Sequence, residues 1–395
     1  MFLFNTLTVG KYKIPVPVLI WFLLAAIAVS LEMSRGIESF NNYFTYKYVF
    51  IHAKNLKNLY VGEPASIYDN LYGPLFSLVI APFSLFNDYI GCFLWCIANA
   101  WFLFYGVSKL NLSHQQKMAA LLIGVIEMMT SIHNVEFNPM VAGWIILSFV
   151  MIEKEKDFWG TFFIVIGMLT KVYGVVGIAF FLFSKHKLKF IVYFLFWVVI
   201  LFCLPMIITS PKFIIQCYHD WYDKIISKNS KNINPNNSYN MQDISVMGLG
   251  RRIFNLKNLS NLSVIIPAAI CYLVPTFRIK EYKNEKFRLS YLAFALIGVV
   301  IFSSSAESPT YSIAMIGVAI WFVIQPRNIF FITLLVFALI ITSLSPTDLF
   351  PRYLKEHFIV PYALKALPCF FIWLVIAYQL MLNKFSTDSL TSINK

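Results

Sequence analysis

Polar side chains in residues 34–82 are the first in the chain whose types could do chemistry. This stretch separates two long apolar runs, is too polar to lie in lipid and is too rich in tyrosine for a plain linker. It contains the carboxylate Glu38, the amides Asn41 and Asn42, and Tyr46. We predict that it folds back over the membrane and forms half of an active site.

Further polar residues lie near the outer ends of the predicted helices. Charged side chains close to lipid cost free energy, so they are expected to face a cavity or water. A cavity that holds both carboxylates and cations suits a lipid-linked substrate that carries phosphate. These residues are Glu136, Asn138, Lys171, Gln242, Asp243, Arg251, Arg252 and Glu307.

Each charged candidate also has a purely structural interpretation. Lys171 can reach water or pair with a carboxylate, and the arginines at 251–252 can bind lipid headgroups. Glu307 precedes a helix start, where the helix dipole favours an acid; Glu136 can orient its own turn, and Glu38 can be an ordinary solvated carboxylate. No histidine or cysteine has metal-ligand spacing, so we expect neither a metal nor another cofactor.

The elements that must position these residues are membrane helices. Apolar residues make up 59% of the 395 residues and charged residues 13%, which is far from the composition of soluble proteins. Apolar runs of spanning length recur, and backbone in lipid must hydrogen-bond within helices. We predict one all-α polytopic membrane domain over residues 1–395, with about 12 transmembrane helices. The net charge of +13 is explained largely by basic cytoplasmic loops, so no nucleic-acid partner is expected.

The lysines and arginines of the loops set the predicted orientation. They place both termini in the cytoplasm and the two large loops, 33–88 and 209–261, outside. Because the N-terminus and the loop after Tyr89–Val107 are both predicted to be cytoplasmic, no membrane crossing remains for Pro74–Phe86. Its thirteen residues measure roughly 20 Å as a helix, so we predict a helix that lies in the membrane interface. Residues 211–229 predict a second, amphipathic interfacial helix. The predicted spans are Pro15–Leu31, Tyr89–Val107, Met118–Ile132, Pro139–Ile152, Phe158–Thr170, Val172–Phe183, Phe190–Ile208, Leu262–Pro275, Leu289–Ser304, Tyr311–Ile324, Ile329–Leu344 and Pro361–Leu382.

Several short segments, YGPLFSLVIAPFSLF from Tyr72 and VEFNP at 135–139 among them, occur in an order that matches a known family. These two segments resemble the Y-P-P-L-F-A-L-x-x-A-P block and the G-Q-x-N-P turn of glycosyltransferase family 87, formerly a domain of unknown function, in the C superfamily of membrane glycosyltransferases. The segment around Lys171 resembles G-x-x-x-G-x-x-x-x-x-K-x-x-P. QDISVMGLGRRIF resembles N-Q-S-x-x-G…R, and SSSAESPTYSIA takes the place of S-P-x-S-W-D-H-H. The NNY and ESPT segments are most similar to a branch from Bacteroidetes-type bacteria.

The resemblance implies an inverting cell-envelope glycosyltransferase of the bacterial inner membrane. It would transfer a sugar, often mannose, from a polyprenyl-phosphate donor to a lipid or glycan acceptor on the outer face. A carboxylate of the first outer loop would act as base, and Lys171 with Arg251 or Arg252 would stabilise the departing phosphate. The residues expected to bind substrate are Asn41, Asn42, Tyr46, Asn138, Gln242 and Asp243.

The chain departs from the family at the expected base. The family's loop aspartate falls on Asn42, an amide that cannot accept the proton, while its glutamine falls on Glu136 and its histidine pair on 308–309. Three carboxylates remain as catalytic candidates: Glu38, Glu136 and Glu307. The alternative is a non-enzymatic lipid-linked sugar transporter, flippase or binding protein, and a transporter needs polar residues through to the cytoplasmic half. A structural or assembly protein would leave the polar groups dispersed.

Overall fold

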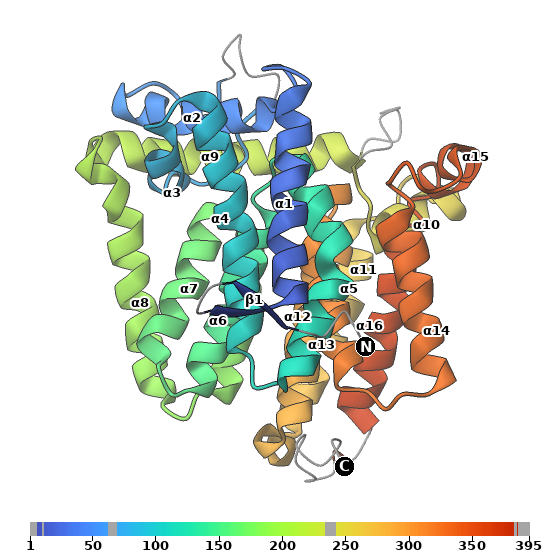
Figure 1. Cartoon of the computed structure of the whole chain (residues 1–395). Helices are drawn as coiled ribbons and strands as arrows, with labels where there is room; N and C mark the ends of the chain where they lie inside the picture. The colour runs from blue at the N-terminus through green and yellow to red at the C-terminus, as the bar shows by residue number, and fades with distance from the viewer. Residues whose placement is uncertain (1–5, 10–11, 62–68, 234–241, 383–384, 386–395) are drawn as a thin grey trace. The chain divides into compact units, whose positions relative to one another are not determined.

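The computed structural model describes residues 6–9, 12–61, 69–233, 242–382 and 385, and these are predominantly helical (Figure 1). One antiparallel hairpin precedes the first helix: β1 (Thr6–Val9) pairs with β2 (Tyr12–Pro15), with Thr6 opposite Pro15. The all-α prediction did not include this hairpin. Two four-residue strands are too short for their alternation to be distinguished from a loop.

The helices follow the apolar runs of the sequence closely, because an apolar run in lipid can form its backbone hydrogen bonds only within a helix. Most ends lie within a few residues of the predicted ones. The helices are α1 (Val16–Ser34), α2 (Asn41–Lys54), α3 (Phe76–Ser84), α4 (Asp88–Lys109), α5 (His114–His133), α6 (Asn138–Glu153), α7 (Asp157–Thr170), η2 (Val172–Phe183), α8 (Lys187–Cys203), η3 (Leu204–Ile207), α9 (Pro211–Ile233), α10 (Val246–Ile253), α11 (Asn261–Leu273), η4 (Val274–Phe277), η5 (Ile279–Lys283), α12 (Glu285–Ile301), η6 (Ser308–Thr310), α13 (Tyr311–Val323), α14 (Ile329–Phe337), η7 (Ala338–Leu344), α15 (Arg352–Leu354), η8 (Lys355–Ile359) and α16 (Ala366–Leu382).

Among the residues that the structure describes, three helical segments are long and apolar enough to cross a bilayer, judged by length and composition alone: α1, α4 and Lys187–Ile207. Seven further apolar helices have 10–17 residues. The membrane-protein class is therefore supported, whereas the count of twelve spans stays a prediction. The segment expected to lie in the interface forms α3, which has nine residues and is roughly 13 Å long at 1.5 Å per residue.

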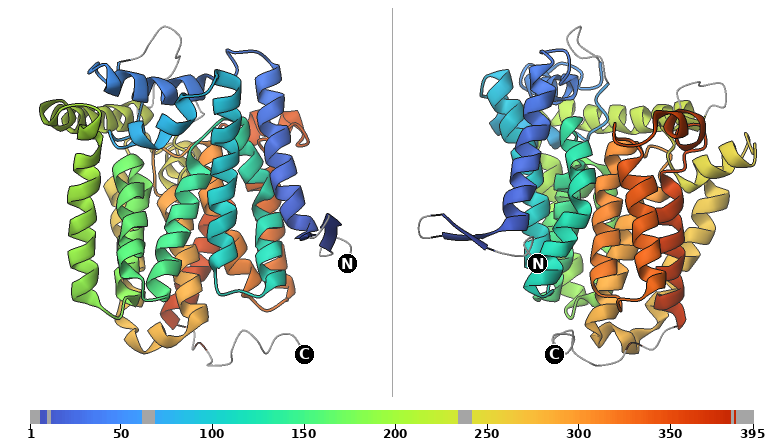
Figure 2. Two further views of the ribbon diagram at one scale, coloured as in Figure 1. Left: turned by 60° about the vertical axis from the view of Figure 1, so that its left-hand side comes forward. Right: turned by 45° about the vertical axis from the view of Figure 1, so that its right-hand side comes forward.

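The chain divides into two compact units, which we call the first-loop unit (20–109 and 128–228) and the second-loop unit (1–19, 110–127 and 229–395). In the first-loop unit, α6 packs between α4 and α7, and α7 packs on α8. Figures 1 and 2 show α2 and α9 lying across one end of these helices, with α3 beneath α2. In the second-loop unit, α12 packs against α13 and α16.

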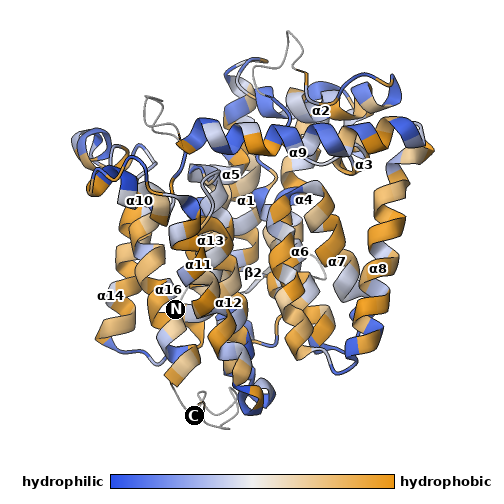
Figure 3. Ribbon diagram, turned by 180° about the vertical axis from the view of Figure 1, so that it is seen from behind, coloured by the Kyte–Doolittle hydropathy of each residue, from blue (hydrophilic) through white to orange (hydrophobic). Residues whose placement is uncertain are grey.

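The helix α9 has the amphipathic pattern expected of an interfacial helix. In Figure 3 its ribbon alternates between hydrophilic and hydrophobic residues, whereas α8 is hydrophobic along most of its length. Its inward side buries Ile214, Cys217 and Trp221. Trp221 Nε1 donates to Leu71 O at 2.9 Å, so α9 holds the segment that leads into α3.

Candidate active site

A tight turn between α5 and α6 positions two of the predicted residues. The backbone N–H of Glu136 donates to Ser131 O at 2.9 Å, and Val135 takes a left-handed conformation with φ +56°. Asn138 then begins α6, with proline at the following position, where the fixed φ of proline suits the first helical turn. The turn thereby ends with Glu136 and Asn138 close together.

Lys171 occupies the break between α7 and η2, in an extended conformation (φ −140°, ψ 118°). Its backbone N–H still bonds Gly167 O at 2.8 Å. The two arms approach closely, because a Cβ added to Gly174 would lie 2.3 Å from the carbonyl carbon of Gly167. The second arm, predicted as an ordinary helix, is a 3₁₀ helix. This break gives the lysine side chain a direction that a continuous helix would not provide.

The Lys171 side chain meets the α5–α6 turn. Its Nζ donates to Asn138 Oδ1 at 2.6 Å and lies 3.8 Å from Glu136 Oε2. Asn138 Nδ2 lies 3.4 Å from the same carboxylate oxygen. The side chains of Lys171 and Glu136 are 18% and 16% exposed, so the ion pair is shielded from water but not sealed. The structure thus brings together three residues that sequence reasoning selected separately.

Two tyrosines complete this group. Tyr72 donates to Glu136 Oε2 at 3.3 Å, and its hydroxyl lies 3.1 Å from that of Tyr46. Lys171 Nζ also lies 5.2 Å from the centre of the Tyr72 ring. Tyr46 was predicted to bind substrate, whereas Tyr72 was noted only as part of a motif. We call Lys171, Glu136, Asn138, Tyr72 and Tyr46 the Lys171 cluster.

A backbone contact explains how Tyr72 reaches Lys171. The N–H of Gly73 donates to Thr170 O at 3.0 Å. Any larger residue at 73 would collide, since a Cβ there would lie 2.1 Å from Leu169 O. The first loop therefore lies directly against the end of α7.

One of the predicted first-loop residues contacts the same turn. Asn42 Nδ2 donates to Asn134 O at 2.8 Å, which ties the start of α2 to the α5–α6 turn. Asn41 Nδ2 donates to the backbone oxygen of Glu38, and the Glu38 side chain is exposed. A second contact was not predicted: His133 Nε2 lies 3.0 Å from Glu32 Oε2. Neither residue belongs to a recognisable motif, and only the fold brings them together.

The predicted residues of the second-loop unit are engaged in holding its loops. Arg251 NH1 donates to Asp243 Oδ2 at 2.6 Å, and its Nε and NH2 donate to Leu259 O. NH2 also donates to Asn261 Oδ1, at the start of α11. Burial raises the pKa of the Asp243 carboxyl, although hydrogen bonding from Ser245 and the charge of Arg251 oppose this shift.

Arg252, Gln242 and Glu307 also lie in the second-loop unit. Arg252 NH2 donates to Gln242 O at 2.5 Å and NH1 to Val360 O at 3.2 Å, and burial lowers the pKa of its guanidinium. Glu307 precedes η6, and its N–H donates to Thr310 Oγ1 at 3.2 Å. The helix-start interpretation of Glu307 thus has a direct counterpart in the structure.

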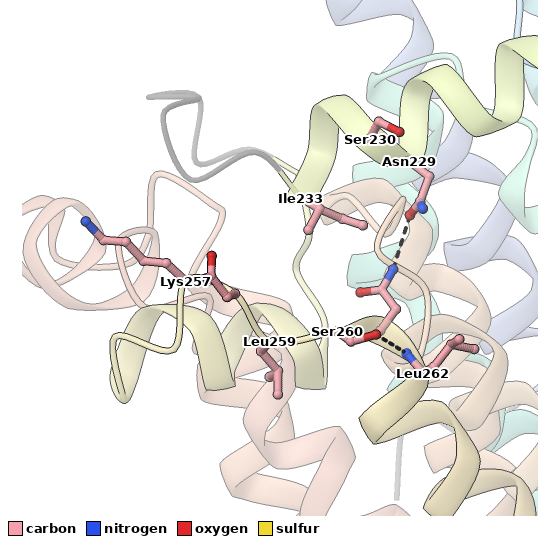
Figure 4. A pocket seen from close by; sticks show the side chains of 9 residues that line it. Asn229, Ser230, Ile233, Lys257, Leu259, Ser260 and Leu262 are labelled. Atoms are coloured by element: carbon pink, nitrogen blue, oxygen red, sulfur yellow. Dashed lines mark hydrogen bonds between the residues drawn. The ribbon is translucent and has the colours of Figure 1, made fainter.

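A hollow of about 630 Å³ lies between the end of α9 and the start of α11 (Figure 4). Lys257, Asn258 and Ser260 on its rim are exposed, and Asn261 Nδ2 donates to Asn229 Oδ1 inside it. The hollow contains none of the residues predicted from sequence. Its amides bond to one another, so the Lys171 cluster is the better candidate for chemistry.

Comparison with known families identifies the class of the protein. A family model described as "Glycosyltransferase family 87" matches residues 70–304. The chain belongs to glycosyltransferase family 87. The family resemblance read from the short segments is confirmed, although the match does not specify a bacterial branch. A search of curated proteins found no match.

Membership of family 87 makes this protein a membrane glycosyltransferase and gives the Lys171 cluster a chemical context. The matched segment contains four of the five cluster residues and begins after Tyr46. It also contains Arg251 and Arg252, and it ends before Glu307. Residues 38–46 precede the matched segment, so the family match does not bear on their predicted roles.

Proposed function

We propose that the protein is an inverting glycosyltransferase that uses a polyprenyl-phosphate sugar, with mannose as the expected sugar. The acceptor is a lipid or glycan at the outer face of the bacterial inner membrane. The observation that carries the proposal is the Lys171 cluster in a family 87 chain. A shielded cation beside an amide, a carboxylate and two tyrosine hydroxyls can bind a phosphate and a sugar together.

The reaction follows from the chemistry of the two substrates. An acceptor hydroxyl oxygen attacks the anomeric carbon as the bond from that carbon to the phosphate oxygen breaks. The polyprenyl phosphate leaves with the electron pair, and Lys171 stabilises its added negative charge. Because attack comes from the side opposite the leaving group, the anomeric configuration inverts.

Lys171 is the cation that we assign to the donor phosphate. Its charge is balanced by Glu136 at 3.8 Å, while its shortest contact is to a neutral amide. A phosphate that enters this cluster would meet a cation, an amide and two tyrosine hydroxyls, all of which can contact its oxygens. Arg251 and Arg252 stay proposals for this role, although their guanidinium groups already bond to loop carbonyls of their own unit.

Glu136 and Asn138 are proposed to orient Lys171 and to contact sugar hydroxyls, together with Tyr46, Asn41 and Asn42. Gln242 and Asp243 remain proposed substrate-binding residues of the second large loop. The acceptor also needs a base, for which Glu38, Glu136 and Glu307 were the candidates from sequence. Such a base typically contributes about 10²- to 10⁴-fold to the rate, so its loss is measurable.

The test is direct transfer. Purified protein in lipid nanodiscs is incubated with radiolabelled polyprenyl-phosphate mannose, glucose or arabinose and a total lipid extract as acceptor. We expect one donor to yield a new labelled product, and Lys171→Met to abolish most of that product. Transbilayer movement of the lipid-linked sugar in liposomes, without any transfer product, would instead establish a flippase.

A further inference from the structure

His133 is the last residue of α5, and its ring contacts a residue far away in the chain. Its Nε2 lies 3.0 Å from Oε2 of Glu32 near the end of α1. The side chain of Glu32 is only 10% exposed, while that of His133 is 37% exposed. The carboxylate is thus buried behind a ring that reaches the surface.

This contact selects the tautomer of the imidazole. Glu32 also accepts a hydrogen bond from Arg35 NH1 at 3.2 Å, and a carboxylate can only accept hydrogen bonds. His133 Nε2 therefore carries the proton, and the lone pair is on Nδ1. A carboxylate behind a histidine also stabilises the imidazolium that forms when the ring takes up a proton.

His133 lies next to the turn that carries two residues of the Lys171 cluster. It lies three positions before Glu136, whose carboxylate contacts Lys171. The adjacent residue, Asn134, is the one whose carbonyl binds the Asn42 side chain. Asn42 itself has no group that can accept a proton from a sugar hydroxyl. The α5–α6 turn carries Glu136, which contacts Lys171, and it follows directly on His133, which contacts the buried carboxylate of Glu32.

We infer that His133 is the general base of the transfer reaction and that Glu32 is its positioning residue. The inference rests on the proposed function. Nδ1 takes the hydroxyl proton of the acceptor as its oxygen bonds to the anomeric carbon, and the polyprenyl phosphate leaves with the electrons of the broken bond. The proton then passes from His133 to water, which restores the neutral ring.

The carboxylates of this unit fit the role less well. Glu136 Oε2 already accepts hydrogen bonds from Tyr72 and Asn138 and lies beside Lys171, so this oxygen is engaged in holding the cluster. The Glu38 side chain is exposed. A histidine at the C-terminal end of a helix can also act only by stabilising that helix through its dipole. The experiment must therefore separate an effect on catalysis from an effect on stability.

The experiment compares His133→Ala and Glu32→Gln with His219→Ala, which removes an exposed histidine from α9 of the same unit. Each full-length variant is assayed in nanodiscs with the donor that the wild type accepts. We expect His133→Ala to lower kcat about 100-fold and Glu32→Gln about 10-fold, with donor KM within about twofold. Added imidazole should restore at least about tenfold activity to His133→Ala alone. Binding of polyprenyl phosphate, measured by tryptophan fluorescence, should be unchanged.

The outcomes separate the two proposals. Wild-type transfer that survives in His133→Ala overturns the base assignment and leaves the proposed function standing. Lost activity that imidazole does not restore, together with weakened polyprenyl-phosphate binding, also overturns it, because the histidine would then be structural. Absence of transfer by the wild type with every donor overturns the proposed function and the base together.

Discussion

Lys171 Nζ donates a 2.6 Å hydrogen bond to Asn138 Oδ1, which joins two helix ends that are 33 positions apart in the chain. The contact places a cation against an amide of the α5–α6 turn, with Glu136 at a longer distance. We proposed this cation as the group that binds the donor phosphate. The first two predictions test that charge.

Replacing Lys171 by methionine keeps the length and apolar stem of the side chain and removes the charge. We expect the dissociation constant for polyprenyl phosphate to rise about 10- to 100-fold, the equivalent of one charged hydrogen bond. Binding is measured by tryptophan fluorescence in nanodiscs. Lys171→Arg should retain part of the affinity, and Lys212→Met, an exposed lysine of α9, is the control. Wild-type affinity in Lys171→Met would show that the phosphate binds elsewhere.

Replacing Asn138 by aspartate puts a carboxylate where Lys171 now meets an amide. The new charge should compete with the donor phosphate for the lysine, so we expect an affinity loss of about tenfold. Asn138→Ala removes the contact without adding charge and should cost less. Equal losses in the two variants, in the same binding assay, would contradict the electrostatic explanation.

Two glycines allow α7 and η2 to approach each other around Lys171. A Cβ at Gly174 would lie 2.3 Å from the backbone of Gly167, whereas a Cβ at Gly167 would lie 3.0 Å from Gly174 Cα. We therefore expect Gly174→Ala to lower both the melting temperature and transfer activity more than Gly167→Ala does. The measurements are thermal unfolding and the rate of sugar transfer. The opposite order would mean that the arms do not meet as described.

Lys365 and Glu127 form a buried ion pair in the second-loop unit. Their N–O distance is 2.7 Å and their side chains are 4% and 0% exposed, and Lys365 also donates to Ser308 Oγ at 2.9 Å. Removing one partner leaves the other charge buried alone. Lys365→Met should therefore destabilise the protein by about 3–5 kcal/mol.

A second substitution is the control for this ion pair. Glu127→Leu combined with Lys365→Met removes both charges and should recover most of the lost stability, measured as the free energy of denaturant-induced unfolding. The double-mutant cycle isolates the pair from other effects of each change. Additive losses in the cycle would show that the two charges do not interact.

Asp243 predicts a dependence of stability on pH. Burial raises its pKa in the folded protein, so its contribution to stability is fully present below the unfolded-state pKa and is lost as pH rises through the folded-state pKa. Asp243→Asn removes this titration and tolerates the positive φ of +53°. The stability of the wild type relative to Asp243→Asn should therefore fall as pH rises from acidic values toward neutral. A constant difference would contradict the raised pKa.

The membrane helices were predictable because their signal is local. An apolar run in lipid must form backbone hydrogen bonds within itself, so α4, α7 and α13 begin and end close to the predicted positions. The shortness of the segment around α3 was also visible in the sequence. The 3₁₀ form of η2 was not, because it depends on the close packing of Gly174 against Gly167.

The sequence by itself determined the class of the protein: an apolar helical chain with a polar first loop, a lysine between two short helices and the segments of family 87. Only the tertiary structure decided which polar residues meet. The contacts of Lys171 with Asn138, and of Glu32 with His133, join residues that no local pattern links. The physical reason is that a membrane helix is specified by its own composition, whereas a contact between side chains depends on how separate helix ends are packed together.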